Sequence, residues 1–424
     1  MKVRHGILAA ILICFSFPSA QLYGAGNFYR VEQRSGVWWF VTPSGQLTLS
    51  IGVDNVSYRG DEIHGTSVHP YFDNISKLYP SKAAWAETEL KRLRLWGFNT
   101  LGSWTDSYLW GRGGMPYTVI LDIATRSGAN WLKGIPVDVY SLRFEATAHE
   151  IAQTECAPRA QDPNLVGYFS DNELRWGPDW RGKKNMLAMY LDLPANSAGR
   201  QHAIEFLKKK YSGSIQRFNQ AWGVHAASFA TVPAEASTAA YQADSAEFLG
   251  MVARRYFDVC AKAIHSADPN HLYLGAKFAG LPPDPVLRAS HATDVDSVDI
   301  YRFDPRPIVK HIYELAHRPV LVAEFAFRAE DSGLPNTRGA GPKLPTQAAR
   351  ARAYKNYVTW LESMPEAVGF HWFEWCDEPK EGRFDGENSN YGLVNIKDQP
   401  YEQFVTAVKA ANRDALSVHR KLMK

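Results

Sequence analysis

The feature that most constrains the fold of this 424-residue chain is a set of eight short apolar runs, each with a polar residue near its C-terminal end. In order they read LTLSIGVDN, GFNTLGSW, YTVILDI, LVGYFSDNE, LYLGAKFAG, VDSVDIYRFD, VLVAEFAF and AVGFHWFEW. Such apolar runs are typical of strands buried on both faces, as in a parallel sheet. Segments with helical spacing separate them, such as 81–97, which has a Ser81 cap and a Gly97 stop. The alternation predicts an α/β fold, a (β/α)8 TIM barrel.

Further helical segments keep the same alternation, and they span 141–156, 245–266, 305–318 and 346–364. Ahead of the first run, residues 28–45 form two alternating stretches turned at Arg34-Ser35-Gly36, which predicts an N-terminal β-hairpin. Extra chain follows the fourth run (about 178–240), the seventh and the eighth. These long loops are expected at the C-terminal face, where such barrels hold their active sites. We predict a single barrel domain over residues 26–424.

The N-terminus has the pattern of a secretory signal. Lys2 and Arg4 precede an apolar run from Ile7 to about Phe17, and small residues follow it. The run is too short to span a membrane. We therefore predict that residues 1–25 are removed and that the protein is secreted, to the periplasm or the extracellular space, without a membrane anchor. The three cysteines that remain, at 156, 260 and 376, are spaced too widely for a disulfide framework and are expected to be buried thiols.

Composition excludes several classes of partner and chemistry. The net charge is +3, from 47 basic and 44 acidic residues with no basic stripe, so nucleic acid is not an expected partner. The chain lacks the second histidine of a zinc-protease helix at His149, a phosphate-binding loop and a Gly-x-Ser-x-Gly elbow. We therefore predict no cofactor and no metal site. The 13 Trp, 20 Tyr and 21 Phe suit a cleft that stacks sugar rings on aromatic faces.

Two glutamates end apolar runs that would lie across the barrel from each other. Glu173 closes the fourth run and Glu324 lies near the end of the seventh. In an eight-stranded ring, both carboxyl groups would face a substrate bound in the mouth. Hydrolysis of a glycosidic bond needs this arrangement, with one carboxyl kept protonated and the other ionised. A single glutamate at a strand end is more often an ion-pair partner, but two at these positions favour catalysis.

These residues carry a resemblance to the retaining glycoside hydrolases of clan A. More narrowly, GYFSDNELRWG, HLYLGAKFA, GFNTLGSW and GFHWFEWCDEPKEGRFDGENSNYGLVN resemble the family 50 β-agarases. The stretch RFNQAWG also resembles the family 42 β-galactosidases. The likeness covers about residue 28 to the end. It implies that Glu173 is the acid/base, Glu324 the nucleophile, Asn172 a ligand of the sugar 2-hydroxyl and His371 a substrate ligand. The agarases of this family usually carry an extra N-terminal domain, and its absence here favours soluble chains or oligosaccharides as substrate.

Other residues near strand ends are candidates for substrate contact. Asp54 and Asn55 close the first run and would bind sugar hydroxyls. Trp104 and Trp176 are candidate stacking platforms, although a tryptophan in a loop is as often a hydrophobic anchor. Lys277 ends the fifth run, where an aliphatic residue would be expected, and indicates a substrate or carboxylate partner.

The sixth and eighth runs add further candidates. Tyr301 could donate a hydrogen bond to the nucleophile or be a core tyrosine. Near the eighth run, Trp375 could contact substrate or pack against helices, and the following loop offers Asp377, Arg383 and Glu387 for sugar diols. Part of that loop is expected to satisfy its own polar groups. The Gly- and Pro-rich segment 332–345 is a candidate lid.

The residues and the resemblance together predict a secreted enzyme that cleaves β-galactosidic linkages in an agarose-like polysaccharide or its oligosaccharides by double displacement. Three alternatives remain open. The same machinery could act on another β-linked galactan, glucan or exopolysaccharide, or it could act as a transglycosylase. The third alternative is a non-catalytic carbohydrate-binding barrel, which would have no need of two facing glutamates.

Overall fold

The structure is a computed structural model that describes residues 26–423, so the predicted signal peptide (1–25) lies outside the described residues. Nine parallel strands form one sheet in the order β8-β7-β6-β5-β4-β14-β11-β10-β9. Their bounds are β4 Ser50–Val53, β5 Thr100–Leu101, β6 Tyr117–Ile120, β7 Leu165–Phe169, β8 Leu272–Tyr273, β9 Phe278–Ala279, β10 Asp296–Asp299, β11 Val320–Phe325 and β14 Ala367–Trp372. Each predicted apolar run contains one of these strands or, in one case, two.

The sheet closes because its two end strands belong to one segment. Strand β8 pairs with β7, strand β9 pairs with β10, and only residues 274–277 separate β8 from β9. Within that gap the Leu274 N–H donates to the Tyr168 carbonyl, and the Ser170 N–H donates to the Gly275 carbonyl. Segment 272–279 is therefore the fifth strand of the ring, and the predicted (β/α)8 barrel is confirmed.

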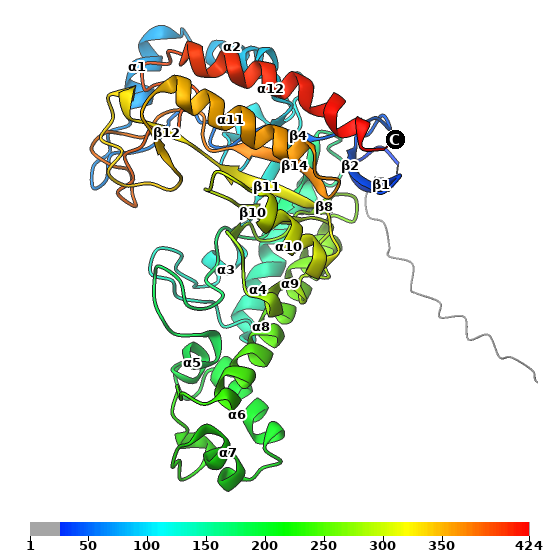
Figure 1. The fold of residues 1–424 in the computed structure, drawn as a ribbon, viewed down its shortest axis with the longest axis vertical. Helices are drawn as coiled ribbons and strands as arrows, with labels where there is room; N and C mark the ends of the chain where they lie inside the picture. The colour runs from blue at the N-terminus through cyan, green and yellow to red at the C-terminus, as the bar shows by residue number, and fades with distance from the viewer. Residues whose placement is uncertain (1–25, 424) are drawn as a thin grey trace, which may run out of the picture.

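Helices cover the outside of the barrel where apolar periodicity predicted them. The predicted helices are α2 (Lys82–Leu95), α4 (Leu142–Ile151), α8 (Ala239–Ala267), α10 (Arg306–Ala316) and α11 (Gln347–Glu362). The Ser81 side chain accepts from the Ala84 N–H at 3.2 Å, which satisfies a free donor in the first turn of α2. Helix α12 (Glu402–Lys421), which was not predicted, packs beside α11 (Figure 1). Shorter helices are α1 (Pro70–Leu78), α3 (Ile123–Arg126) and α9 (Asp284–Leu287).

The N-terminal hairpin closes the bottom of the barrel. Strands β1 (Arg30–Arg34) and β2 (Val37–Val41) pair antiparallel as predicted, and β3 (Leu47–Thr48) adds a third strand. Tyr29, Val31 and Phe40 form one apolar cluster with side chains from inside the barrel, including Phe169 and Leu321. The C-terminus lies beside this hairpin (Figure 1), where the His419 ring bonds the Trp38 carbonyl at 3.0 Å. The hairpin thus leaves the opposite, C-terminal face of the barrel for a substrate.

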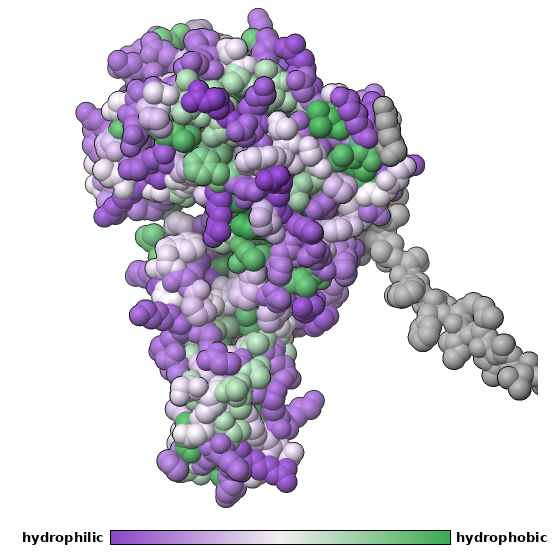
Figure 2. All heavy atoms as spheres, viewed as in Figure 1, coloured by the Kyte–Doolittle hydropathy of each residue, from purple (hydrophilic) through white to green (hydrophobic). Residues whose placement is uncertain are grey.

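The insertion after β7 forms an arm that extends from the barrel (Figure 1). It contains α5 (Met186–Leu191), α6 (Ala198–Lys210) and α7 (Ile215–Trp222), which pack on the N-terminal half of α8. Helix α8 has 29 residues, about 43 Å at 1.5 Å per residue, so it runs from the arm to the barrel wall. On the face shown in Figure 2, apolar residues are scattered in small groups among hydrophilic ones. Among the described helices, none has a stretch long and apolar enough to cross a bilayer.

The three cysteines of the described chain, Cys156, Cys260 and Cys376, are free and buried, as the sequence predicted.

Candidate active site

A cleft of about 410 Å³ opens at the C-terminal ends of the barrel strands, a volume within the range of small-molecule sites. Eight of the residues predicted to act in catalysis or substrate binding line it. They are Asn55, Trp104, Asn172, Glu173, Tyr301, Glu324, Arg383 and Glu387. The cleft therefore brings together side chains from six of the eight barrel strands and their following loops.

Glu173 lies on the cleft wall with its backbone firmly held. Its N–H donates to the Lys277 carbonyl at 2.9 Å, and its own carbonyl accepts from the Arg181 guanidinium at 2.9 Å. The Trp131 indole N–H donates to Glu173 Oε2 at 3.2 Å. Burial and the negative charge of Glu324 raise the pKa of Glu173 to about 7. A carboxyl group with this pKa can hold a proton at neutral pH and release it during a reaction.

Glu324, in β11, is 4 % exposed and is held by two donors. The Lys277 ammonium group bonds Oε1, and the Tyr301 hydroxyl donates to Oε2. The bond from the Lys277 ammonium group is charge-assisted, which makes it stronger than a neutral hydrogen bond. The two glutamates of one cleft therefore have different surroundings, which is the arrangement that separates an acid from a nucleophile.

Lys277 is a partner of Glu324 and not a ligand exposed to substrate. Its side chain is completely buried, and its Nζ lies 4.0 Å from Asp299 Oδ1 and 4.0 Å from the centre of the Trp104 ring. Burial alone would lower the pKa of Lys277, but the charges of Asp299 and Glu324 raise it above its usual value. Of the two roles considered for Lys277, the carboxylate partner fits the structure and the substrate ligand does not.

Two other predicted contacts lie inside the barrel, below the cleft. His371 is completely buried, with Nε2 at 2.8 Å from the Ser50 hydroxyl, because its strand neighbour Gly52 leaves room for the ring. Asp54 is also completely buried, and its Oδ1 accepts from the Ser103 N–H at 2.7 Å. Neither residue lines the cleft, and the substrate contacts of Asp54 and His371 stay predictions.

Three more predicted contacts point away from the cleft. Trp176 packs against Phe257 of α8, with ring centres 5.9 Å apart. Trp375 stacks on Trp96, and its indole N–H donates to the Tyr71 hydroxyl at 3.1 Å. Asp377 is buried, and its Oδ1 accepts from the Asn390 amide at 2.8 Å and from the Gly392 N–H at 2.9 Å. Each of these side chains packs or bonds within the fold and is absent from the cleft lining, and the substrate roles of Trp176, Trp375 and Asp377 stay predictions.

The backbone at the mouth is unusual at five consecutive strand ends. Non-glycine residues there adopt the left-handed region of positive φ, which costs an L-residue of the order of 1 kcal/mol or more. These residues are Asn55 (φ 52°), Trp104 (57°), Asp122 (53°), Glu173 (46°) and Lys277 (40°). The fold holds each of them in this conformation. Four of the five line the cleft, and Lys277 does not.

The cleft also contains residues that sequence reasoning missed. They are Asp61, Asp122, Thr125, Trp131, Phe373 and Phe384. Asp122 lies two residues after the end of β6. A polar residue near a strand end indicated the other site residues, and the same pattern could have identified Asp122. Trp131 lies in an irregular loop, and no local pattern marks it as the donor to Glu173.

The predicted lid segment lies at the cleft, where Ala340 forms part of the lining. It is anchored to the loop after β14, because Asn388 Oδ1 accepts from the N–H groups of Thr337 (3.0 Å) and Arg338 (3.1 Å). A Cβ at Gly341, which has φ of 77°, would lie 2.6 Å from the Ala326 carbonyl oxygen. The segment is therefore fitted to the strand ends and held in place over one side of the cleft.

A second cavity of about 480 Å³ adjoins the first around Glu173. Both are lined by Trp131, Glu173, Tyr301, Ala340 and Glu387. Trp180, at the start of the arm insertion, lines the second cavity and is 67 % exposed. The site thus offers space on two sides of the Glu173 carboxyl group, as a bond within a chain of sugars requires.

Comparison with known proteins agrees with this architecture. The barrel has glutamates at the ends of its fourth and seventh strands, β7 and β11. This arrangement defines a class of protein that resembles the clan A glycoside hydrolases. No family model matches the chain. The chain is 30 % identical to β-agarase A and 28 % identical to β-agarase B, both of Vibrio sp. (strain JT0107), over 91 % and 95 % of its own length. It spans about half the length of these curated relatives, 45 % and 49 %.

Solved structures give the same result. An exo-β-agarase superposes with a TM-score of 0.82 at 25 % identity, covering 93 % of this chain and 66 % of that one. The agarase AgWH50C superposes with a TM-score of 0.81 at 26 % identity, covering 96 % of this chain and 67 % of that one. The predicted resemblance to the family 50 β-agarases is confirmed.

Proposed function

We propose that this chain is a secreted retaining glycoside hydrolase that cleaves β-galactosidic linkages in an agarose-like polysaccharide or its oligosaccharides. The observation that carries the proposal is the pair of carboxyl groups in one cleft, with Glu324 held by Lys277 and Tyr301 and with the pKa of Glu173 raised to about 7. The curated relatives named β-agarases support the choice of substrate. The N-terminal sequence pattern supports export.

In the first step of the proposed reaction, Glu324 attacks the anomeric carbon while Glu173 donates its proton to the glycosidic oxygen. The bond to the leaving sugar breaks, and a glycosyl ester forms at Glu324. The negative charge of Glu324, which raises the pKa of Glu173, is now lost. The pKa of Glu173 therefore falls and its carboxyl group is ionised. In the second step this carboxylate accepts a proton from water while the water oxygen attacks the anomeric carbon and the ester bond to Glu324 breaks, which releases the sugar with its configuration retained.

Asn172 is placed to bind the sugar beside the reacting bond. It lines the cleft, and its buried Oδ1 has no hydrogen-bond partner among the described residues. An amide oxygen in this position can accept from a sugar hydroxyl, and a buried acceptor without a partner is costly until it does so.

The test is release of reducing sugar from soluble agaro-oligosaccharides by the purified protein, with Glu324→Gln as the variant. The wild-type protein is expected to release sugar, and the variant is expected to lose at least about a thousandfold in kcat. Glu381→Gln is a matched control, because Glu381 lies in the loop after β14 with a side chain 46 % exposed and should leave the rate unchanged. NMR of the first product should show the β-anomer.

Two outcomes would contradict the proposal. Full activity of Glu324→Gln would remove Glu324 as the nucleophile. Activity on other β-linked galactans or glucans, but none on agaro-oligosaccharides, would reject the substrate and keep the mechanism.

A further inference from the structure

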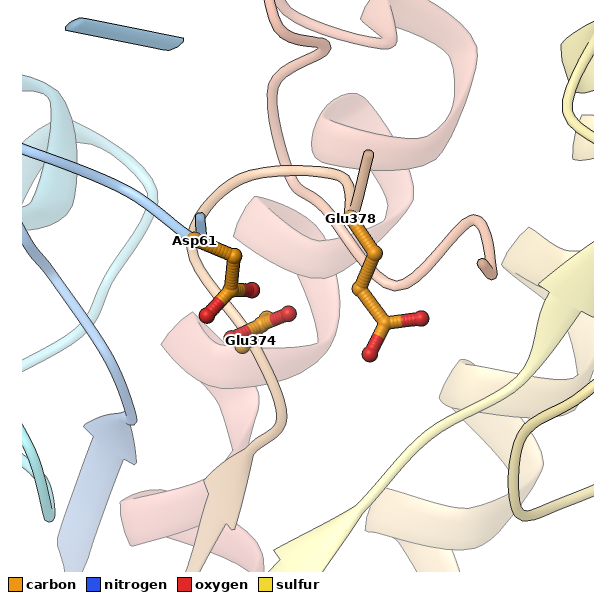
Figure 3. Close-up of side chains that lie close together, drawn as sticks. All are labelled: Asp61, Glu374 and Glu378. Atoms are coloured by element: carbon orange, nitrogen blue, oxygen red, sulfur yellow. The ribbon is translucent and has the colours of Figure 1, made fainter. Parts of the chain in front are cut away.

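Three acidic side chains that lie far apart in the sequence converge beside the cleft (Figure 3). Asp61 follows β4, whereas Glu374 and Glu378 follow β14. One oxygen from each of the three carboxyl groups lies within 4.8 Å of the others. Figure 3 shows the Glu374 carboxyl group between those of Asp61 and Glu378. Asp61 also lines the cleft, so this acidic group lies at its edge.

Too few basic side chains lie near this acidic group to pair with all of its carboxyl groups. Arg383 is the basic residue there, and its guanidinium pairs with Glu378 (3.0 Å), Asp385 (3.0 Å) and Glu387 (3.1 Å). Within residues 26–423, no basic nitrogen lies within 4.0 Å of the carboxylates of Asp61 or Glu374, which form no ion pair. Three of the five carboxyl groups thus pair with the Arg383 guanidinium, and two have no basic partner among the described residues.

A separate observation points to a ligand between these side chains. Glu374 is 1 % exposed, and its Oε2 accepts from the Asn55 amide. Its other oxygen, Oε1, is buried and has no hydrogen-bond partner in the described part of the chain. A buried carboxylate oxygen without a partner is costly unless a proton or a cation occupies the space in front of it.

We propose that Asp61, Glu374 and Glu378 form a binding site for a divalent cation of the calcium type. Calcium binds oxygen ligands at 2.3–2.6 Å, so oxygens on opposite sides of the ion are about 5 Å apart, which matches the spacing of the three carboxyl groups. Three carboxyl ligands from the protein suit calcium better than magnesium, which usually keeps several waters and binds through one or two carboxylates. The three ligands include no histidine or cysteine, which disfavours zinc.

This site was not predicted from the sequence. Asp61 lies 313 residues before Glu374, and these two residues follow different strands of the barrel. The cation would neutralise the acidic edge of the cleft and fix the loop after β14, which carries Arg383 and Glu387, against the loop after β4. The proposal does not depend on the substrate, since it concerns cation binding by the chain alone.

The experiment measures calcium uptake by the full chain without substrate. The protein is stripped with EDTA, dialysed and titrated with calcium chloride alone by calorimetry, and thermal unfolding is followed with and without calcium. We expect about one calcium ion per chain, weaker binding of magnesium, and a Tm that rises with calcium concentration. Glu374→Gln should weaken calcium binding by at least about tenfold, while the exposed matched control Glu381→Gln should bind as the wild type does.

Asp61→Asn is a second test, because Asp61 is only half-buried and its amide is less of a risk to folding than a change at Glu374. It too should weaken calcium binding. The proposal is overturned if the wild-type chain takes up no calcium at about 1 mM. It is also overturned if Glu374→Gln and Asp61→Asn bind calcium as tightly as the wild type, since the ion would then lie elsewhere. Loss of hydrolysis without any change in calcium uptake would concern the proposed reaction only.

Discussion

Lys277 shows how one buried cation organises the acidic side chains around the nucleophile. Its ammonium group bonds Glu324 and lies 4.0 Å from Asp299, whose two carboxylate oxygens are buried without hydrogen-bond partners among the described residues. Removing one member of a buried ion pair leaves an uncompensated charge. The stability of the barrel mouth should therefore depend on Lys277 as strongly as its chemistry does.

We predict that Lys277→Met lowers the free energy of unfolding by about 3–5 kcal/mol. The cost should be at least about 1 kcal/mol smaller when Asp299→Asn is already present, because one of the unpaired carboxylates has then been removed. Urea unfolding of the four proteins of this double-mutant cycle measures both values. An equal cost in the two backgrounds would show that Asp299 and Lys277 do not interact.

Glu173 gives a prediction for the pH dependence of the reaction. Its pKa is raised by burial and by Glu324 to about 7, and it must be protonated to act as the acid. The protonated fraction falls as the pH rises through this pKa, so kcat/KM should fall on the alkaline side with a midpoint near pH 7.

The Trp131 indole provides the control for this assignment. Its N–H donates to Glu173 Oε2, and this hydrogen bond lowers the pKa of Glu173. Trp131→Phe should therefore move the alkaline limb to higher pH, by up to about one unit. If the midpoint of the alkaline limb does not change in Trp131→Phe, a group other than Glu173 is responsible for it. Profiles of kcat/KM from pH 5 to 9 decide between the two.

At the scale of elements, the strands could be predicted and the direction of single side chains could not. The apolar run before Asp171 became β7, and Asn172 and Glu173 follow it into the cleft, because a barrel strand must end at the mouth. Alternation along a strand separates inward from outward residues but does not give their depth. His371 points into the barrel, yet it lies a layer below the cleft, against Ser50.

The loops were harder to interpret because long-range contacts decide their conformation. Trp176 follows Glu173 by three residues, but it packs on α8, which begins more than sixty residues later. Trp131 contacts Glu173 from the loop after α3, and nothing in its own neighbourhood indicates that contact. Composition identifies such residues as candidates, and only packing assigns them.

The anchored segment over the cleft gives a prediction at this scale. Asn388 holds it through the backbone N–H groups of Thr337 and Arg338. Asn388→Ala removes these bonds, each worth about 1 kcal/mol, and should loosen the segment. We expect KM to rise by roughly three- to tenfold with a smaller change in kcat, because Asn388 is absent from the cleft lining. Steady-state kinetics on one oligosaccharide measures both constants, and a fall in kcat alone would contradict this role.

At the scale of the whole molecule, the barrel and the arm together shape the site. The barrel supplies the carboxyl pair, and the insertion after β7 supplies Arg181, which fixes the Glu173 backbone, and Trp180, which lines the second cavity. A substrate that occupies both cavities would contact both parts. The arm is therefore expected to affect long substrates more than short ones.

Trp180→Ala tests this expectation. The exposed indole offers a stacking face for a sugar unit beyond the cleaved bond. The variant should lose roughly tenfold in kcat/KM on long agaro-oligosaccharides and much less on the shortest one that is cleaved. Leu132→Ala is the control, because it truncates another side chain that is more than half exposed (53 %). It should change kcat/KM by the same factor on long and on short agaro-oligosaccharides. Equal losses for both lengths would place Trp180 outside the substrate path.

The left-handed residues at five strand ends have a consequence for directed evolution. Glycine adopts positive φ without the steric cost that Asn55, Trp104, Asp122, Glu173 and Lys277 bear. A library of this protein screened only for heat resistance should therefore accumulate glycine at the first four of these positions, although each change would remove a side chain from the mouth, but not at Lys277, whose loss leaves Glu324 without its buried cation. The two selections should give opposite results for glycine at residues of the active site. Glycine should be enriched there by thermal selection and depleted by selection for growth on the polysaccharide, and this difference alone would identify the site.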